Sequence, residues 1–248
     1  MNDISRYKPP KDLLANKIIA VTGAGSGIGK TIAIGYAAHG ATVLLLGRTV
    51  AKLEGTYDDI EQAGYPQPAI IPIDFASAEE ADYDNIKEAI EKNFDRLDGL
   101  LHNAALIGER TSIASYTLKS WQKLMTVNVT APFILSKKLL PLLQKSPSAS
   151  MIFTGSSVGH KGKAYWGAYA VSKAANENLM QILADELDDV SNIRVNSINP
   201  GATRTQMRAD AYPAEDPITV KSAVDLIPSY LYLMGDGSEG LSGQQFSA

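Results

Sequence analysis

The sequence predicts an α/β fold in which helices cover both faces of one doubly wound parallel sheet. Short, continuous apolar runs alternate along the chain with longer amphipathic stretches, and strands of that kind are typical of a parallel sheet buried on both sides. Chemically informative residues also follow the ends of these runs, at the sheet edge where such folds bind ligands. These residues are Gly23, Arg48, Asp74, Asn103, Ser156 and Pro200. We expect one domain spanning 1–248.

The first half of the chain alternates strand and helix without interruption. "KIIAVTG" is an apolar run that ends in glycine, and "IGKTIAIGYAAH" repeats apolar side chains at helical spacing. The same reasoning extends through "ATVLLLG", "VAKLEGTYDDIEQAG" and "PAIIPIDF". In order, we expect a strand at 17–23, a helix at 28–39, a strand at 41–47, a helix at 50–64, a strand at 68–75 and a helix at 79–94.

The second half repeats the alternation with longer helices. We expect a strand at 97–105, a long helix at 118–144, a strand at 149–157, a second long helix at 167–189, a sixth strand at 193–201 and a late helix at 222–235. Residues 203–220 form the longest irregular stretch. Irregular segments of that length are often binding loops or lids, so we expect a substrate loop there. A short polar leader, 1–14, precedes the first strand.

Composition excludes several classes of function. The net charge of −4 gives no global basic field, so neither a nucleic acid nor an anionic membrane is an expected partner. The chain has neither the apolar core of a signal peptide nor an apolar run long enough for a membrane helix. Cysteine is absent, which removes disulfides and thiolate metal sites, and no metal site is expected. A cytoplasmic protein is the default expectation.

The stretch "VTGAGSGIGKT", residues 21–31, is glycine-rich and ends in Gly-Lys-Thr. A P-loop for ATP or GTP would need glycine five positions before the last glycine, where Ala24 stands. The general dinucleotide pattern G-x-G-x-x-G fails as well, because it would need glycine at Ile28 or at Lys30. We therefore expect Lys30 to point away from any bound nucleotide.

The spacing that fits is T-G-x-x-x-G-x-G, formed by Thr22, Gly23, Gly27 and Gly29. It resembles the glycine motif of the short-chain dehydrogenase/reductase family. Gly23 would permit a tight exit from the strand, Gly27 the close approach of a pyrophosphate, and Gly29 close packing of helix on sheet. The N–H groups of Ser26, Gly27 and Ile28, at the start of the helix, would hold the phosphates. The alternative is a glycine-rich turn without a ligand.

The end of the second strand, "LLLGRT", predicts the choice of cofactor. Proteins that bind NAD place an acidic residue there for the ribose hydroxyls, and Gly47 occupies that position. The next residue, Arg48, can pair with a 2′-phosphate, and Thr49 adds a hydroxyl donor. We expect NADP(H) in preference to NAD(H); the alternative is that Arg48 is a solvated loop residue.

"YAVSK" places Tyr169 and Lys173 on one face of a helix, four residues apart. A lysine charge near the phenol oxygen favours the phenolate, which matters because an unperturbed tyrosine has a pKa of about 10. Ser156 lies thirteen residues before Tyr169 at the end of a predicted strand, and Asn128 lies on the preceding long helix.

These four residues match the Asn, Ser, Tyr, Lys tetrad of the short-chain dehydrogenase/reductase family, whose motifs run in order from about residue 14 to 245. The resemblance implies further cofactor contacts. They are Asp74 and Phe75 near adenine, Asn103, Ala104 and Ala105 in "HNAA", and Pro200, Gly201, Thr203 and Thr205 in "NPGATRT". "HNAA" departs from the family's N-N-A-G at His102, expected to be a packed structural residue, and at Ala105.

The stretches "LHNAALIG", "WGAYAVSK" and "RTQMRADAYPAEDP" resemble a bacterial subgroup of these oxidoreductases. The resemblance implies hydride transfer between NADP(H) and a small-molecule carbonyl or alcohol. Tyr169 would be the general acid/base, Ser156 would bind the carbonyl oxygen, and Lys173 would lower the pKa of Tyr169 and bind ribose. Asn128 would hold a relay water. A non-catalytic NADP(H)-sensing regulator and a 3-oxoacyl-thioester reductase stay open.

The family resemblance also implies a homodimer or homotetramer built from the two long helices. The substrate pocket is less defined by sequence. Its expected lining is Leu106, Ile107, Val158, Tyr165, Trp166 and the loop 203–220.

Overall fold

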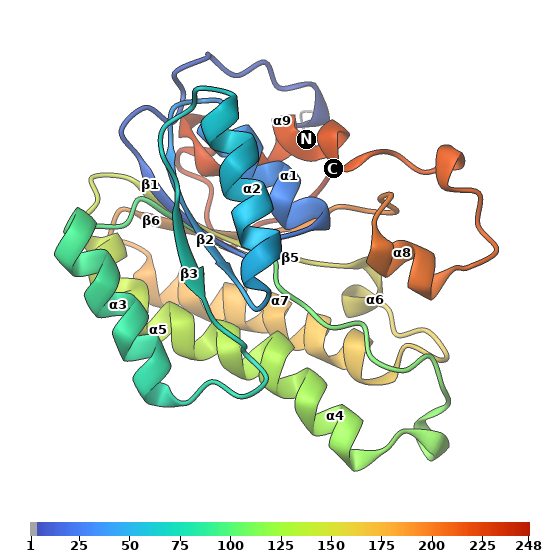
Figure 1. The fold of residues 1–248 in the computed structure, drawn as a ribbon. Coiled ribbons are helices and arrows are strands. Elements are labelled where there is room, and N and C mark those ends of the chain that lie inside the picture. Colours follow the sequence, from blue (N-terminus) through green and yellow to red (C-terminus); the bar gives the residue numbers. More distant parts are fainter. Residues whose placement is uncertain (1–3) are drawn as a thin grey trace.

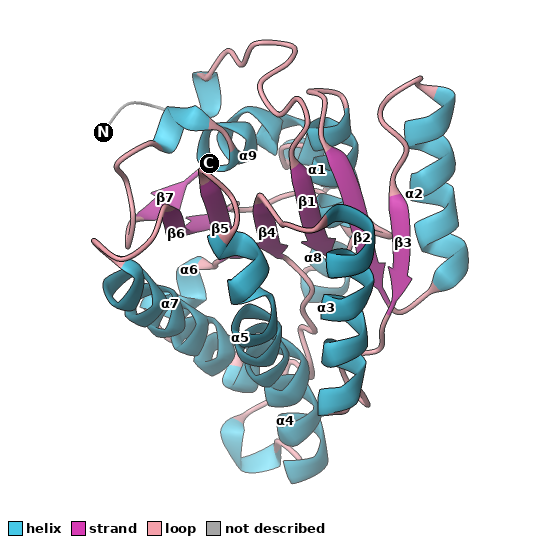
Figure 2. Ribbon diagram, turned by 90° about the vertical axis from the view of Figure 1, so that its left-hand side faces the viewer, coloured by secondary structure: helices cyan, strands magenta, loops and turns pink. Residues whose placement is uncertain are grey.

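A computed structural model describes residues 4–248, and its centre is a seven-stranded sheet (Figures 1 and 2). All strand pairs are parallel, and the strand order is β3-β2-β1-β4-β5-β6-β7. The strands are β1 Ile18–Thr22, β2 Thr42–Gly47, β3 Ala69–Pro72, β4 Gly99–His102, β5 Ala149–Thr154, β6 Ile193–Asn199 and β7 Gln245–Ser247. The expected doubly wound parallel sheet is confirmed.

Helices cover the sheet on both faces, as Figure 2 shows. One face packs against α1 Gly27–Ala37, α2 Val50–Gln62 and α9 Ile227–Met234. The other packs against α3 Glu80–Phe94, α5 Ala131–Gln144 and α7 Gly167–Leu187. The remaining helices are α4 Leu118–Met125, α6 Ser157–His160 and α8 Gln206–Ala211.

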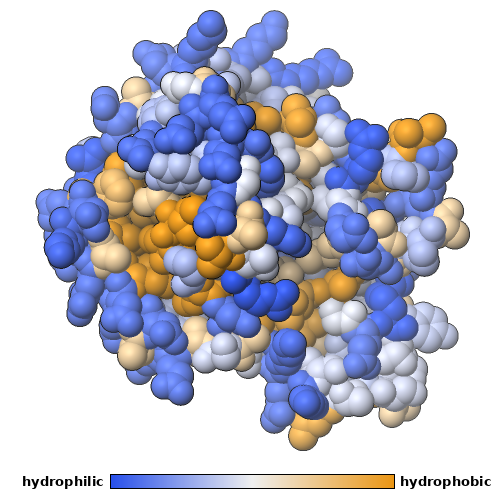
Figure 3. All heavy atoms as spheres, in the orientation of Figure 1, coloured by the Kyte–Doolittle hydropathy of each residue, from blue (hydrophilic) through white to orange (hydrophobic). Residues whose placement is uncertain are grey.

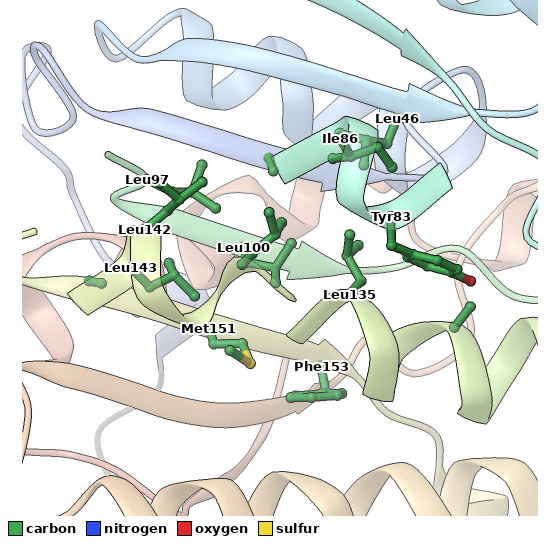
Figure 4. Packing of buried hydrophobic residues seen from close by; sticks show 14 of the residues in the cluster. Leu46, Tyr83, Ile86, Leu97, Leu100, Leu135, Leu142, Leu143, Met151 and Phe153 are labelled. Carbon is green, nitrogen blue, oxygen red and sulfur yellow. The ribbon is translucent and has the colours of Figure 1, made fainter. Parts of the chain in front are cut away.

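The apolar strands supply both layers of the core because successive side chains point to opposite faces. In β2, Leu44 and Leu46 join the cluster under α3, α5 and α7, whereas Val43 and Leu45 join the cluster under α1, α2 and α9. Figure 4 shows the first cluster, in which Leu100 of β4 lies among leucines of α5. Full burial of such a side chain contributes about 1.5–3 kcal/mol, so continuous apolar strands specify this sandwich.

The chain order reverses direction across the sheet between β1 and β4, which are neighbours. From β1 the chain winds outwards through β2 to β3, and from β4 it winds the other way to β7. In such a sheet the loops after these two strands separate and leave a crevice at the strand ends. The loops after β1 and β4 are the glycine motif and Asn103, Ala104 and Ala105.

Three local expectations about helices and strands need correction. The long helix expected at 118–144 is α4, a π-helical segment Thr126–Thr130, and α5. The stretch 203–220 is not wholly irregular, because it contains α8. The seventh strand, β7, was not predicted. It pairs with residues Ser197 to Asn199 of β6 and forms one edge of the sheet.

The polar leader is also more structured than its composition suggested. Leu14 is fully buried, and Ile4 belongs to the core cluster under α9. The Tyr7 ring packs edge-on against Tyr232, with centroids 5.3 Å apart. Residues 1–3 of the expected leader lie outside the described residues. The apolar positions of this segment were too few and too irregularly spaced to predict such packing.

The edge strand β3 is less well covered than its neighbours. Figure 3 shows an apolar area on the face that carries β3, and all residues of this strand are at least partly exposed.

Within residues 4–248, no helix combines the length and the apolar character that crossing a bilayer requires.

Candidate active site

The glycine loop joins β1 to α1 with backbone geometry that other residues would disturb. Gly23 has a φ of +70°, in the left-handed region that favours glycine. A Cβ added at Gly29 would lie 2.2 Å from the Gly23 carbonyl oxygen and 2.6 Å from Nδ2 of Asn103. The first turn of α1 is thus pressed against the end of β1, and the Gly27 and Ile28 amides belong to the free end of the helix. This cradle fits a pyrophosphate.

Thr22 ties the two diverging loops together. Its Oγ1 donates to the Leu101 carbonyl oxygen at 3.1 Å and accepts from the amides of Asn103 and Ala104 at 2.9 and 3.0 Å. The side-chain amide of Asn103 in turn donates to the Thr22 carbonyl oxygen at 3.3 Å. The hydroxyl is buried, so these bonds hold the crevice at a fixed width. The motif spacing includes Thr22 but gives no sign of this clasp.

Two adjoining cavities, of about 280 and 200 Å³, form one cleft along the carboxyl ends of the strands. Gly23, Ser26, Ala104 and Ala105 line both, so the glycine loop lies at their junction. Of the other expected cofactor residues, the larger cavity contains Gly27, Ile28, Asn103, Tyr169, Lys173, Pro200, Gly201, Thr203 and Thr205. Gly29 lines neither cavity, because it packs behind the loop.

The smaller cavity contains the residues expected to choose the cofactor. Arg48 and Thr49 lie on its wall together with Asp74 and Phe75. The wall also includes Lys52, an exposed residue of α2 that sequence reasoning missed. The only feature of the sequence that could have placed Lys52 near the cofactor is its position one helical turn after Thr49. Two exposed cations therefore face one end of the cleft, an arrangement that suits a phosphate group.

Three expected catalytic residues converge on the larger cavity: Ser156 from the turn between β5 and α6, and Tyr169 and Lys173 from α7. Lys173 is buried, and its Nζ lies 5.6 Å from the Tyr169 ring centroid and donates to the Thr154 carbonyl oxygen at 2.6 Å. Burial lowers the pKa of Lys173 to about 8. Tyr169 and Lys173 are held by α7, which packs on β5, β6 and α6, and Ser156 is held in the turn just before the first residue of α6.

Burial is the largest influence on the pKa of Tyr169. Burial raises the pKa of the phenol, and the hydrogen bond with the Ser156 side chain lowers it without reversing that effect. Lys173, which was expected to lower this pKa, donates its hydrogen bond to the Thr154 carbonyl oxygen. Its effect on the phenol stays a prediction.

Asn128 lies behind the cavity and lines neither part of the cleft. It sits within the π-helical segment, a feature that often marks functional sites. Its side chain accepts from the Leu106 amide and donates to the Leu106 carbonyl oxygen, both at 2.8 Å. Its own carbonyl oxygen accepts from Nδ2 of Asn176 at 2.8 Å. In this structure the side chain braces the loop after β4.

Two residues singled out from the sequence lie away from the cleft walls. Nζ of Lys30 pairs with Asp59 of α2 at 2.6 Å, so the Gly-Lys-Thr ending faces the neighbouring helix. His102 is buried against the Phe153 ring, and its Nε2 lies 2.8 Å from Oγ of Ser136. Burial lowers the pKa of His102 to about 3, which keeps the imidazole neutral at physiological pH.

The far end of the larger cavity is lined by Ile107, Trp166 and one face of α8. Arg110 stacks on the Trp166 ring at 3.9 Å from its centroid and donates to the carbonyl oxygens of Tyr165 and Ala211. On the next ring, Arg208 stacks on Tyr212 at 3.8 Å.

Three of the expected pocket residues have other positions. Leu106 lines the smaller cavity instead of the larger one. Val158 is buried and lines neither cavity. The Tyr165 side chain is 60% exposed. The larger cavity is also lined by four residues of α8, within the loop 203–220, that sequence reasoning did not name individually. They are Gln206, Met207, Arg208 and Ala211.

A family model described as short chain dehydrogenase matches residues 17–216. Among curated proteins, the oxidoreductase YciK of Escherichia coli K12 is 47% identical over 242 residues, which cover 98% of this chain and 95% of that protein. The bacterial subgroup expected from the sequence is the one to which YciK belongs.

Solved structures agree with that comparison. A short chain dehydrogenase from Pseudomonas syringae is 52% identical, with a TM-score of 0.96, covering 97% of this chain and 98% of that one. Another, from Shigella flexneri 2a and complexed with NADP, is 46% identical with a TM-score of 0.93, covering 96% of this chain and 99% of that one.

Proposed function

The chain belongs to the short-chain dehydrogenase family of oxidoreductases, and from that premise we propose that it is an NADP(H)-dependent enzyme that interconverts a carbonyl and a secondary alcohol. The observation that carries this proposal is the convergence of Ser156, Tyr169 and Lys173 on the cavity that begins at the glycine loop. The proposed nucleotide cradle and the proposed proton donor would then share one cleft, as a hydride-transfer reaction requires.

The proposed cofactor contacts follow the cleft from end to end. The amides of Ser26, Gly27 and Ile28 would hold the pyrophosphate, and the loop containing Asn103 and Ala104 would flank the adenosine ribose. Asp74 and Phe75 would border the adenine. The stretch from Pro200 to Thr205 borders the larger cavity and would flank the nicotinamide. When bound, NADP(H) supplies or accepts the hydride.

The preference for NADP(H) rests on Arg48 and Lys52. Both line the smaller cavity, and the second strand ends without a carboxylate at Gly47. A guanidinium and an ammonium group would pair with a 2′-phosphate, whereas a carboxylate would repel it. The relative from Shigella flexneri in complex with NADP supports the same choice.

In the reductive direction, Ser156 would donate a hydrogen bond to the substrate carbonyl oxygen and stabilise its growing negative charge. Tyr169 would then transfer its phenolic proton to that oxygen. The raised pKa of Tyr169 keeps the phenol protonated near neutral pH, which suits a proton donor. The Lys173 ammonium, buried beside the phenol ring, would stabilise the phenolate left after the transfer.

The test is Tyr169→Phe, which removes the proton donor and keeps the ring. We expect reductase activity towards a panel of aldehydes and ketones to fall by about 10²–10⁴-fold, while NADPH binding, followed by cofactor fluorescence, persists. Tyr165→Phe is the matched control, because Tyr165 is the exposed neighbour on the same segment, and its activity should equal that of the wild type.

Two results would contradict the proposal. Equal turnover by the Tyr169→Phe variant would remove Tyr169 from the mechanism. NADPH binding by the wild type without turnover of any carbonyl compound in the panel would favour the non-catalytic NADP(H) sensor.

A further inference from the structure

Glu177 is a buried acid that the proposed mechanism does not use. It lies on α7 four residues after Lys173, on the same face of the helix, and only 6% of the residue is exposed. Carboxylates are rarely buried to this extent unless a charged or hydrogen-bonding partner compensates them. The environment of Glu177 therefore calls for an explanation.

The carboxylate lies beneath the turn that carries Ser156. Its Oε2 accepts from the Ser197 hydroxyl of β6 at 2.5 Å. Its Oε1 lies where a Cβ of Gly155 would stand, since that added atom would be 2.3 Å away. His160 of α6 is the other titratable group facing it, with Nε2 4.0 Å from Oε1 and a side chain that is 41% exposed.

Lys173 and Glu177 thus contact consecutive residues of one chain segment. The ammonium group donates to the carbonyl oxygen of Thr154, and the carboxylate packs against Gly155. The hydrogen bond that the structure shows for the ammonium group, within residues 4–248, is to this neutral carbonyl, and the residues that line the larger cavity include no carboxylate. A buried ammonium group without a nearby anion is costly, so its charged form depends on a carboxylate outside the cavity wall.

We propose that Glu177 is a positioning residue for Lys173, whose buried carboxylate keeps the lysine in its charged form and supports the turn that presents Ser156. Burial lowers the pKa of Lys173, and the charge of Glu177 raises it in opposition. Removal of that charge should therefore lower the pKa of Lys173 further, so that the ammonium group loses its proton at a lower pH.

The experiment follows Lys173 directly in the full-length chain. Protein labelled with ¹³C-lysine is titrated by NMR, and the Lys173 resonance is identified by its loss in Lys173→Arg. In Glu177→Gln, which keeps the shape and the contact with Ser197, we expect the Lys173 midpoint to move to lower pH. Glu186→Gln, which removes an exposed charge from the same helix, is the matched control and should leave the midpoint unchanged.

A second variant guards against a folding defect. His160→Arg places a positive charge that does not titrate beside the same carboxylate at an exposed position, and it should also lower the Lys173 midpoint. An unchanged midpoint in whichever of the two variants folds would overturn the proposal and leave Glu177 with a purely structural role.

The consequence for turnover rests on the proposed function. The alkaline limb of kcat/KM for NADPH-dependent reduction should move to lower pH in Glu177→Gln, because the charged form of Lys173 is lost earlier. A lowered lysine midpoint without any reductase activity in the wild type would sustain the coupling and contradict the enzyme assignment, so the two failures are distinguishable.

Discussion

The nucleotide part of the cleft, around the glycine loop, and its substrate end are built in different ways. At the glycine loop the walls are backbone: Gly23 takes a left-handed conformation, and Gly29 leaves no room for a side chain against the Gly23 carbonyl oxygen. At the substrate end the walls include the long side chains of Trp166 and Arg208. Behind them, Arg110 stacks on Trp166, and Arg208 stacks on Tyr212. The shape of the first part is set by the chain path, and the second part is assembled from separate segments.

This difference bears on how each end recognises its ligand. Backbone amides at a helix start can bind a phosphate without help from particular side chains. Stacked arginines and aromatic rings have a shape that depends on each side chain present. Substitutions should therefore act on cofactor binding at one end and on substrate selectivity at the other.

Among substitutions that compare these two parts of the cleft, Gly29→Ala should have the largest effect. The added Cβ would meet two fixed atoms, the Gly23 carbonyl oxygen and Nδ2 of Asn103, and overpacking of this kind costs about 1–3 kcal/mol of stability. A displaced glycine loop also loses charge-assisted hydrogen bonds of about 1.5–3 kcal/mol each. We expect NADPH affinity, measured by fluorescence titration, to fall by about a hundredfold or more.

Gly55→Ala is the matched control for that substitution. Gly55 lies within α2, and a Cβ there would meet nothing within 4 Å. Alanine should stabilise the helix by about 0.5–1 kcal/mol and leave NADPH affinity unchanged. Wild-type affinity in the Gly29 variant would mean that the loop tolerates a shift and that its fixed backbone is not what binds the cofactor.

Arg48→Asp should have the next largest effect, confined to the nucleotide end. It replaces the proposed partner of the 2′-phosphate by a carboxylate, and hydrogen bonds to charged groups contribute about 1.5–3 kcal/mol. The ratio of NADPH to NADH affinity should fall by about ten- to a hundredfold. Lys119→Asp makes the same change in net charge at an exposed site of α4 and should not alter that ratio. An unchanged ratio in the Arg48 variant would remove Arg48 from cofactor recognition.

The same contrast explains what the sequence could predict. The strands follow from hydrophobic periodicity, and the glycine loop and the grouping of Ser156, Tyr169 and Lys173 were expected from motifs that resemble those of the family. The Thr22 clasp was not predictable, because it joins residues about eighty positions apart. The π-helical segment at Asn128 was missed because its sequence continues the helical apolar pattern.

The substrate end was the least predictable for the same reason. Arg110 reaches the carbonyl oxygens of Tyr165 and Ala211, which lie 55 and 101 positions away in the chain. No local sequence pattern predicts such long-range contacts, because an arginine in an irregular stretch usually has a solvated side chain. The helix α8 was hidden in a stretch with few apolar residues, where its amphipathic signal is weak.

Arg110→Ala should have the smallest effect and should act on the substrate end alone. It removes a cation–π contact worth about 0.5–1 kcal/mol at exposed sites and releases α8 from the segment that carries Trp166. We expect KM for the carbonyl substrate to rise by about two- to fivefold, with NADPH affinity unchanged. Lys163→Ala, which removes a more distant cation 6.0 Å from the Tyr212 ring, is the control and should change neither. A loss of NADPH affinity in the Arg110 variant would show that the two ends of the cleft are coupled, and the contrast between them would then fail.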